Sequence, residues 1–312
     1  MVMHRGIKLR HIRAFLDIAK EGSLSAVARE QGITQPALSR TLSELEDLLG
    51  VALFRRENRR LVLTEHGAIF RRHASQGLQA FETGAAALRP DYAGGAVRVG
   101  ILPSAATDLF PRLALKLRNL SPETLLKIET GPHKHLVGLL RDGRIDLMFG
   151  RMPDASDMSG LAFEHLYEED IVLVARNGHP QFGAHPTEFL QQSPVILPPE
   201  DAIIRRPVND YLSTLNLFGL RPAFETVALA IGLWIVTSSD SVWFISRGVV
   251  SDEIKRGRLV EIPTDVRFLS GAVGMTYRHG ARMSQSLDLL MRLTRDEAML
   301  HGNSAEPHRG AE

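Results

Sequence analysis

The sequence predicts an α + α/β chain: a small N-terminal winged helix-turn-helix domain, a long linker helix and a two-lobed C-terminal α/β domain. Three observations predict it. Short helical stretches separated by Gly22 and Gly32 open the chain, an apolar stripe at helical spacing runs over 65–88, and short β-rich runs alternate with amphipathic helices beyond Pro90. At 312 residues, 44% of them hydrophobic, the chain is long enough for two or three domains.

Composition and charge exclude several classes of protein. No apolar run approaches the ~20 residues that span a bilayer, and the N-terminus lacks the apolar core of a secretory signal. The absence of cysteine excludes disulfides, thiolate zinc sites and cysteine nucleophiles, and is compatible with the cytoplasm. Residues 1–90 carry 14 Lys+Arg against 9 Asp+Glu, whereas the rest of the chain has a net charge of −4. A basic N-terminal module is expected where only that part meets a polyanion.

The first three helices form the predicted helix-turn-helix. The first covers 8–21, ends at Gly22, and has an apolar face of Ile12, Phe15, Leu16 and Ala19. Ser23 or Ser25 can cap the second, and Gly32 closes it in a left-handed conformation. Thr34 is the expected N-cap of the third helix, with Pro36 in its first turn.

The third helix has two unlike faces. Its apolar face comprises Leu38, Leu42, Leu45 and Leu49. The opposite side and the preceding turn offer small polar or basic groups suited to base edges in a major groove: Thr34, Gln35, Pro36, Ser39, Arg40 and Ser43. Phosphate would repel the acidic side chains Glu44, Glu46 and Asp47, so only the N-terminal half should enter a groove. The competing interpretation is a solvated face of a three-helix interaction domain.

A hairpin and a long helix follow. VALFRRENRRLVLT reads as a β-hairpin wing whose tip arginines, Arg55, Arg56, Arg59 and Arg60, would contact phosphate or enter the minor groove. The helix over 65–88 carries the stripe Phe70, Ala74, Leu78, Phe81, Ala85 and Leu88. Such a stripe should be buried against a partner, most economically the same helix of a second chain. We assign dimerisation to Phe70, Leu78, Phe81 and Leu88.

The C-terminal half should contain a ligand site at its strand ends. Buried parallel strands are expected at 97–101, 125–129 and 145–150, with helices over 107–120 and 134–142. Further strands are expected at 171–175, 194–197, 242–246 and 271–277. Ligands bind at the C-terminal strand ends of such sheets, which here carry Ser104, Thr107, Thr130, His133, Arg151 and Pro198. Plain N-capping explains Ser104 and Thr107 equally well, and a histidine at such a place is more often a surface residue.

The sequence gives no support for a metal site, a hydrolase or a nucleotide-binding protein. The pair His133 and His135 has no third ligand at a sensible spacing, so we expect no metal. No G-x-S-x-G, P-loop or G-x-G-x-x-G motif lies at a strand–helix junction, and we expect no cofactor and no enzyme. Trp234 and Trp243 are expected in the core or between the lobes.

The segment GSLSAVAREQGITQPALSRTLSELEDLLGVALFRRENRRLVLTEHG resembles the N-terminal domain of LysR-type transcriptional regulators almost from end to end. The order of parts is also similar, so the resemblance covers essentially the whole chain. It implies a bacterial regulator that binds double-stranded DNA, whose linker helices pair antiparallel into dimers that commonly form tetramers. In matching positions, Thr34, Gln35, Pro36, Ser39, Arg40 and the wing arginines would contact DNA. Many members have a glycine near the wing tip, where this chain has RRENRR.

The resemblance also implies the domain limits. These are a DNA-binding domain over 1–64, a linker helix over 65–90, an effector domain of periplasmic-binding-protein type over 91–302 and a flexible tail over 303–312. The first lobe of the effector domain would span about 95–167 and 268–300, the second about 168–267. A small effector would bind between the lobes, and the resemblance favours an effector role for Ser104.

Two further stretches, VRVGILP and GRMPDASDMSGLAFEHLYEEDIVLVARNGHP, resemble a branch of this family with regulators of protocatechuate catabolism and of a galactose-binding protein. The branch implies either an acid from aromatic ring cleavage, such as a carboxymuconate, or a sugar. A multiply charged acid would suit His133, Lys134, Arg151 and Arg205. The alternatives are a solute-binding or sensor protein whose N-terminal domain mediates association and, more distantly, an enzyme in the α/β half.

Overall fold

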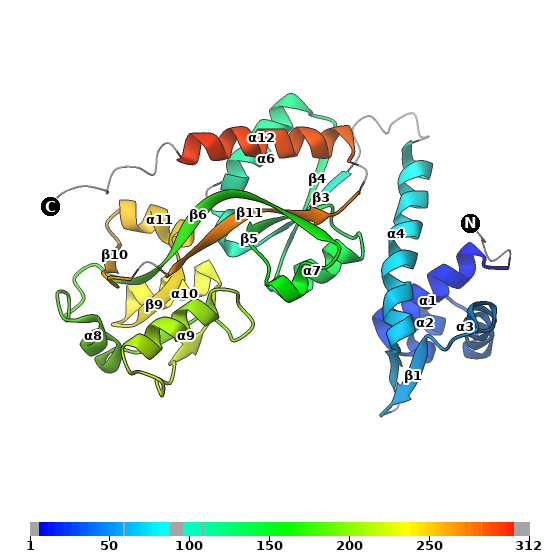
Figure 1. Cartoon of the computed structure of the whole chain (residues 1–312), viewed down its shortest axis with the longest axis horizontal. Coiled ribbons are helices and arrows are strands. Elements are labelled where there is room, and N and C mark those ends of the chain that lie inside the picture. The colour runs from blue at the N-terminus through cyan, green and yellow to red at the C-terminus, as the bar shows by residue number, and fades with distance from the viewer. Residues whose placement is uncertain are drawn as a thin grey trace. The chain divides into compact units, whose positions relative to one another are not determined.

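The computed structural model describes residues 6–58, 60–87, 96–107, 109–266, 268–281 and 283–302. The chain divides into two compact units, residues 1–92 with 141–144 and residues 93–140 with 145–312. The first, the N-terminal unit, contains α1 (Leu9–Glu21), α2 (Leu24–Glu30), α3 (Gln35–Leu49), β1 (Phe54–Glu57), β2 (Arg60–Leu63) and α4 (Glu65–Ala87) (Figure 1). These elements confirm the predicted winged helix-turn-helix and long helix.

Capping side chains set the ends of the short helices. Ser23 Oγ, and not Ser25, accepts a hydrogen bond of 3.3 Å from the Ala26 N–H and caps α2. Thr34 Oγ1 accepts one of 3.4 Å from the Ala37 N–H and caps α3, as predicted. Gly32, between them, has a φ of +65°, a conformation that a glycine adopts without a steric penalty.

The core of the N-terminal unit joins α1, α3 and the start of the wing. The buried residues of α1 are His11, Ala14, Phe15 and Ile18. The predicted apolar face of α1 packs on this core, with Phe15 fully buried and Ile12, Leu16 and Ala19 half-buried against it. Leu38, Leu42 and Leu45 are buried as predicted, and Leu49 is half-buried.

The wing is a two-stranded antiparallel hairpin in which Glu57 pairs with Arg60. Asn58, in the two-residue turn, has a φ of +45°. Asparagine tolerates this left-handed region better than other side chains, so the turn forms without a glycine.

In the C-terminal unit, the first lobe is a five-stranded layer with helices packed on it. β3 (Ala96–Ile101) pairs in parallel with β4 (Leu125–Thr130) and β5 (Leu147–Arg151). β11 (Ser270–Arg278) lies antiparallel between β5 and β6 (Leu161–Arg176). The accompanying helices are α5 (Pro103–Ala106), α6 (Leu109–Leu120), α7 (His133–Arg141), the 3₁₀ turn η1 (Ala155–Asp157) and α12 (Gln285–Gly302); α6 and α12 lie side by side (Figure 1). The prediction of a buried strand at 125–129 was wrong, because β4 is an edge strand and leaves Leu125 and Ile128 more than half exposed.

The second lobe continues from the C-terminal half of β6. That half pairs with β9 (Val242–Ser246) and β10 (Leu259–Ile262), and β9 pairs with β7 (Val195–Leu197), which pairs with β8 (Phe224–Glu225). Its helices are α8 (Pro186–Gln192), α9 (Arg205–Thr214), α10 (Leu229–Ser238) and α11 (Arg247–Lys255). The strand predicted at 171–175 is therefore the end of β6, which runs without a break through the predicted lobe limit near 167 and connects the two lobes.

The two tryptophans lie in opposite environments. Trp243, on β9, is fully buried. Trp234, on α10, is 70% exposed, so its predicted place in a core or between lobes was wrong for this chain. The helix is apolar on nearly every side, LAIGLWIVTS, and sequence periodicity therefore could not tell which face is buried.

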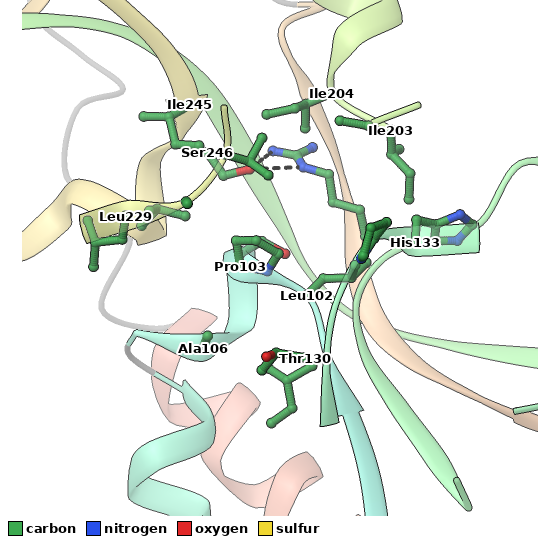
Figure 2. A pocket seen from close by; sticks show the side chains of 18 of the residues that line it. Leu102, Pro103, Ala106, Thr130, His133, Ile203, Ile204, Leu229, Ile245 and Ser246 are labelled. Carbon is green, nitrogen blue, oxygen red and sulfur yellow. Dashed lines mark hydrogen bonds between the residues drawn. The ribbon is translucent and has the colours of Figure 1, made fainter. Parts of the chain in front are cut away.

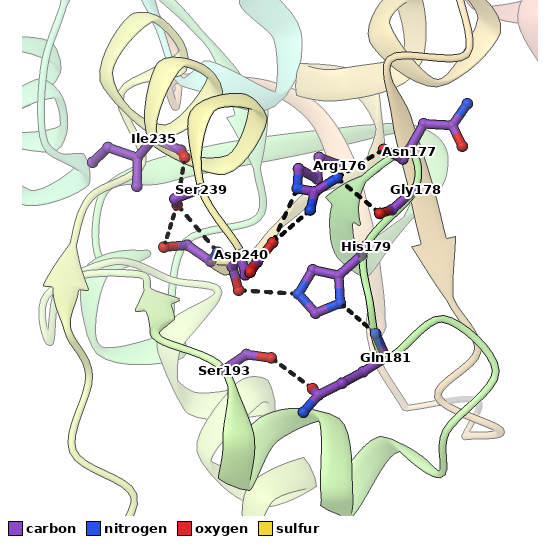
Figure 3. Close-up of polar contacts among 10 residues, drawn as sticks. Arg176, Asn177, Gly178, His179, Gln181, Ser193, Ile235, Ser239 and Asp240 are labelled. Atoms are coloured by element: carbon purple, nitrogen blue, oxygen red, sulfur yellow. Dashed lines mark hydrogen bonds and ion pairs between the residues drawn. The ribbon is translucent and has the colours of Figure 1, made fainter.

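A polar cluster fixes the loop after β6 to the end of α10 (Figure 3). Arg176 Nε and Nη2 donate to Asp240 Oδ1 at 3.0 and 2.7 Å. The buried His179 accepts at Nδ1 from the Gln181 N–H, so its Nε2 carries the proton that bonds the Asp240 carbonyl at 3.0 Å. Both ring nitrogens are thus used within the lobe.

Candidate functional site

The N-terminal half of α3 is presented to solvent by a buried apolar base. Leu38, Leu42 and Leu45 hold the helix to its unit, while the opposite side is exposed. Thr34, Gln35, Pro36, Arg40 and Ser43 are exposed and Ser39 is half-buried, so the six predicted residues lie on or beside one accessible surface. An exposed row of hydroxyl, amide and guanidinium groups has the donors and acceptors that base edges require.

The acidic half of α3 has internal partners. Glu44 Oε2 lies 3.2 Å from Arg10 Nη2 and 3.3 Å from His11 Nε2, both on α1. Glu46 Oε1 accepts from the Leu53 and Phe54 N–H groups at 2.6 and 3.2 Å, which anchors the first strand of the wing to α3. These two carboxylates therefore also stabilise the fold; that Glu44, Glu46 and Asp47 keep the C-terminal half of α3 out of a groove stays a prediction.

The wing strands expose Arg55, Arg56 and Arg60, and Arg59 lies outside the described residues. Arg55 Nε pairs with Glu57 Oε1 at 2.7 Å on the same strand.

The predicted dimerisation residues fall into different environments. Phe70, on α4, stands edge-on to Phe15 with ring centroids 5.0 Å apart, so its ring packs within its own unit. Further along α4, Leu78 is half-buried and Phe81 is 70% exposed, while Leu88 lies outside the described residues. Of the three that the structure describes, Phe81 is the most exposed side chain.

A cavity of about 600 Å³ lies between the two lobes of the C-terminal unit. Figure 2 shows first-lobe side chains (Leu102, Pro103, Ala106, Thr130, His133) below those of the second lobe (Ile203, Ile204, Ile245, Ser246). Its wall is mainly apolar and also includes Ile101, Pro199, Val227, Leu229 and Val249. Such a site suits a small molecule with an apolar body and few polar groups.

The structure brings five of the six predicted ligand residues to this cavity: Ser104, Thr107, Thr130, His133 and Arg151. Pro198 is not part of the wall; the neighbouring Pro199 is, while the Pro198 carbonyl accepts a hydrogen bond from Arg205. The strand-end rule located the right turn but cannot specify which of two adjacent prolines faces inward.

The hydroxyls of the first strand end do not cap a helix. Leu102 is the N-cap residue of α5 and makes no side-chain cap bond. Ser104 Oγ is buried without a hydrogen-bond partner among the described residues, and Thr107 Oγ1 donates to the Gly248 carbonyl of the second lobe at 2.7 Å. The N-capping interpretation of both residues was therefore wrong. A bound polar group could recover the hydrogen bond that Ser104 lacks.

Arg151, in the cavity wall, is paired with the buried carboxylate of Glu169 behind it. Its Nη2 lies 3.4 Å from Glu169 Oε2 and donates to the Glu169 carbonyl at 3.0 Å. Its Nε and Nη2 also donate to Ser246 Oγ at 3.2 and 3.1 Å, and Glu169 Oε1 accepts from the Gly248 N–H at 3.1 Å. Burial raises the pKa of Glu169 to about 7, although Arg151 and these hydrogen bonds act in the opposite direction. Burial also lowers the pKa of Arg151.

Two glycines leave room for this pair. A Cβ on Gly248 would lie 2.4 Å from Glu169 Oε1, and a Cβ on Gly271 would lie 2.7 Å from Arg151 Nη1. No sequence pattern pointed to Glu169, which sits in the acidic run EED before a buried strand. Ser246 ends the strand VWFIS, so the strand-end rule could have found it.

Two other side chains that were predicted to suit a multiply charged acid, Lys134 and Arg205, do not line the cavity. Lys134 is exposed and outside the cavity wall. Arg205 is also outside the wall and is occupied by Glu200 at 2.6 Å and Glu225 at 2.8 Å. In the part of the chain that the structure describes, no three His, Asp or Glu side chains lie close enough together to bind a metal ion. Among the same residues, no helix combines the length and the hydrophobicity of a membrane span.

Comparisons with known proteins agree with this arrangement. Residues 9–68 match the family of bacterial regulatory helix-turn-helix proteins, lysR family, and residues 90–299 match the LysR substrate binding domain. The HTH-type transcriptional regulator PcaQ of Agrobacterium fabrum is 34% identical over 296 residues, covering 94% of this chain and 95% of that protein.

Solved structures show the same fold. A full-length OxyR variant from Pseudomonas aeruginosa aligns with a TM-score of 0.63 at 22% identity, covering 94% of this chain and 95% of the other. Full-length CbnR complexed with its target DNA aligns with a TM-score of 0.60 at 18% identity, covering 93% and 100%. At these identities the likeness concerns the fold alone.

Proposed function

We propose that this chain, which belongs to the LysR family of bacterial transcriptional regulators, reads DNA through α3 and its wing and responds to a small organic acid in the cavity between its lobes. As a LysR-type regulator it binds DNA and a small effector; the residues, the effector class and the assembly are the proposed parts.

For DNA, the observation that carries the proposal is the polarity of α3. Three buried leucines fix the helix, and Gln35, Arg40 and Ser43 are exposed on it. Together with Thr34, Pro36 and Ser39 they would contact bases, while Arg55, Arg56, Arg59 and Arg60 would contact phosphate or the minor groove.

For the effector, the support is the cavity with Ser104, Thr107, Thr130, His133 and Arg151 in its wall. The identity with PcaQ and the resemblance to regulators of protocatechuate catabolism favour an acid of aromatic catabolism. The largely apolar wall disfavours a sugar, whose many hydroxyls would need hydrogen-bond partners.

For assembly, we propose a cytoplasmic homodimer formed through α4 and a tetramer built from dimers. The support is the exposed Phe81, aligned with Leu78 on a helix whose first turns are covered by its own unit. The predicted Leu88 would continue this stripe.

The DNA part is tested with full-length protein and a labelled fragment from upstream of its own gene. We expect Arg40→Ala and Ser39→Ala each to weaken binding about tenfold or more, because a base contact contributes ~1–3 kcal/mol. Arg292→Ala, an exposed arginine of α12, is the matched control. Light scattering should give one molar mass for all variants. Loss of assembly with unchanged DNA affinity would instead indicate that the N-terminal domain mediates association.

A further inference from the structure

We infer that the effector is a compact aromatic molecule with a single carboxylate. This carboxylate pairs with Arg151 and displaces Glu169 from its ion pair, and Glu169 gains a proton from solvent as the effector binds. The inference rests on the proposed function, since it assumes an organic acid in this cavity. It narrows the class, because a carboxymuconate carries three carboxylates.

The charge of the cavity wall limits the charge of its ligand. Arg151 is the one permanently charged cation in the described wall, and Asp201 contributes an opposite charge at its exposed rim. The other cations that would suit a multiply charged acid, Lys134 and Arg205, lie outside the wall. A tricarboxylate would therefore bring two further anionic groups to a wall whose remaining polar side chains, such as Ser104 and Thr130, carry no positive charge, which is unfavourable.

The apolar part of the wall suits a ring. Side chains from both lobes line the cavity on opposite sides, among them Pro103 and Leu102 below and Ile204 and Ile245 above (Figure 2). A flat aromatic body bearing one carboxylate would bury its faces against these groups and direct its single charge to Arg151.

Arg151 already pairs with a carboxylate of its own chain. Arg151 and Glu169 are both at least nine-tenths buried, and Ser246 and Gly248 of the second lobe bind the same pair. One guanidinium does not neutralise two buried carboxylates, so one of them has to be protonated. Glu169 is the better proton acceptor, because burial has raised its pKa to about 7, whereas a benzoic acid is ionised well below that pH.

Other titratable and charged groups lie near the Arg151–Glu169 pair. Tyr167, Glu168 and Asp170 of β6 act on the charge of Arg151, and Asp170 also acts on Glu169. Arg247 of α11 pairs with Asp170 at 3.6 Å and with Glu261, Ser246 accepts from Arg151, and Ser270 donates to the Glu169 carbonyl. His133, in the cavity wall with Asp157 3.9 Å away, is the competing titratable group and needs its own control.

The test uses full-length protein and three probes in titration calorimetry. The probes are 3,4-dihydroxybenzoate with one carboxylate, its neutral amide, and 3-carboxy-cis,cis-muconate. We expect the benzoate to bind at least tenfold more tightly than either of the other two. Measured in buffers of different ionisation enthalpy, its binding at pH 7.5 should take up about three quarters of a proton, the ionised fraction of a group with a pKa of about 7.

Variants then locate the proton. The dissociation constant of the wild type for the benzoate should rise about tenfold from pH 6 to pH 8, and that of Glu169→Gln should not change. His133→Asn should keep the tenfold change, as should Glu253→Gln, a buried carboxylate of α11 paired with Arg256 and Arg258.

Three results would overturn the inference while leaving the proposed function intact: tight binding of the carboxymuconate, benzoate binding without proton uptake by the wild type, or a pH dependence that survives in Glu169→Gln. Because proton uptake is measured on the unaltered protein, a folding defect in a variant does not remove the test. Failure of all acids to bind would instead contradict the proposed effector class as well.

Discussion

Ser25 Oγ of α2 donates a hydrogen bond of 2.9 Å to Oε1 of Gln35, the first residue of α3. This bond fixes the orientation of the Gln35 amide. The bond engages the amide oxygen and leaves the Nε2 hydrogens of Gln35 for other partners. An amide in this orientation has both donor hydrogens free and one of its two acceptor lone pairs occupied, which favours the acceptors of guanine over adenine, whose bidentate contact needs both a donor and an acceptor.

We therefore predict that Ser25→Ala changes base preference more than affinity. Without this hydrogen bond, the protein should bind sites with adenine opposite Gln35 about as tightly as sites with guanine. The difference in binding free energy between the two bases should shrink by roughly 1 kcal/mol. The measurement is binding to a set of single-base variants of the protected sequence, with the exposed Ser159→Ala as control. An unchanged ranking of bases in Ser25→Ala would contradict the assigned role.

Two helical glycines should respond oppositely to alanine. A Cβ on Gly232 of α10 would lie 2.5 Å from the buried Trp243 ring, whereas a Cβ on Gly138 of α7 would meet nothing within 4 Å. Gly232→Ala should therefore lower the free energy of unfolding by about 1–3 kcal/mol, and Gly138→Ala should raise it by ~0.5–1 kcal/mol. Urea unfolding followed by tryptophan fluorescence reports on the C-terminal unit, which contains both tryptophans of the chain. Equal midpoints would contradict the packing described at Trp243.

Glu169 should make the stability of the C-terminal unit depend on pH. Its pKa is raised by burial from 4.5 to about 7, so between these values the folded protein holds a proton that the unfolded chain releases. The stabilisation is present at the acid end of this range and is lost as the pH rises through 7. We expect the free energy of unfolding to fall by on the order of 2 kcal/mol from pH 5.5 to 8 relative to Glu169→Gln. Parallel pH profiles of the two proteins would show that another group is responsible.

Phe81→Glu should dissociate the oligomer without unfolding the individual chain. The side chain is 70% exposed, so a charge there costs the single chain little, whereas it would be buried in a paired α4. We expect the sedimentation mass of the variant to fall to half of the wild-type mass or less, with an unchanged circular dichroism spectrum. Phe70→Glu is the contrasting variant, because Phe70 packs on Phe15 and its loss should lower the melting temperature. An intact oligomer in Phe81→Glu would place the dimer contact elsewhere.

Sequence reasoning was most successful where a local rule decides the structure. Ser23, Gly32, Thr34 and the leucines of α3 obey capping, turn and periodicity rules, and each occupies its predicted position. It failed where tertiary context decides, as for the exposed face of β4 and for Trp234 on the uniformly apolar α10. Edge position and helix rotation are set by neighbouring elements, which no local pattern specifies.

The ligand site shows the same division. Strand ends in a parallel layer meet at one edge, and this rule brought Ser104, Thr130 and Arg151 to the cavity from three separate strands. Most of the second-lobe wall and Glu169 were missed. The wall includes residues of the loop after β7 and of β9, and Glu169 lies behind it on the crossing strand β6. Whether a cation faces ligand or a protein carboxylate, as for Arg205, depends on side-chain contacts that spacing does not reveal.

The central claim is that one chain reads DNA with the N-terminal half of α3 and adjusts this contact when an acid binds between its lobes. The most direct measurement is a DNase I footprint on the DNA upstream of its own gene, made with and without 3,4-dihydroxybenzoate. At the lowest concentration at which the wild type fully protects the DNA, we predict a protected region whose extent changes with the acid, loss of full protection by Arg40→Ala, and wild-type protection by Arg292→Ala. Protection by Arg40→Ala equal to that of the wild type, or a wild type that leaves this DNA unprotected in both conditions, would contradict the claim.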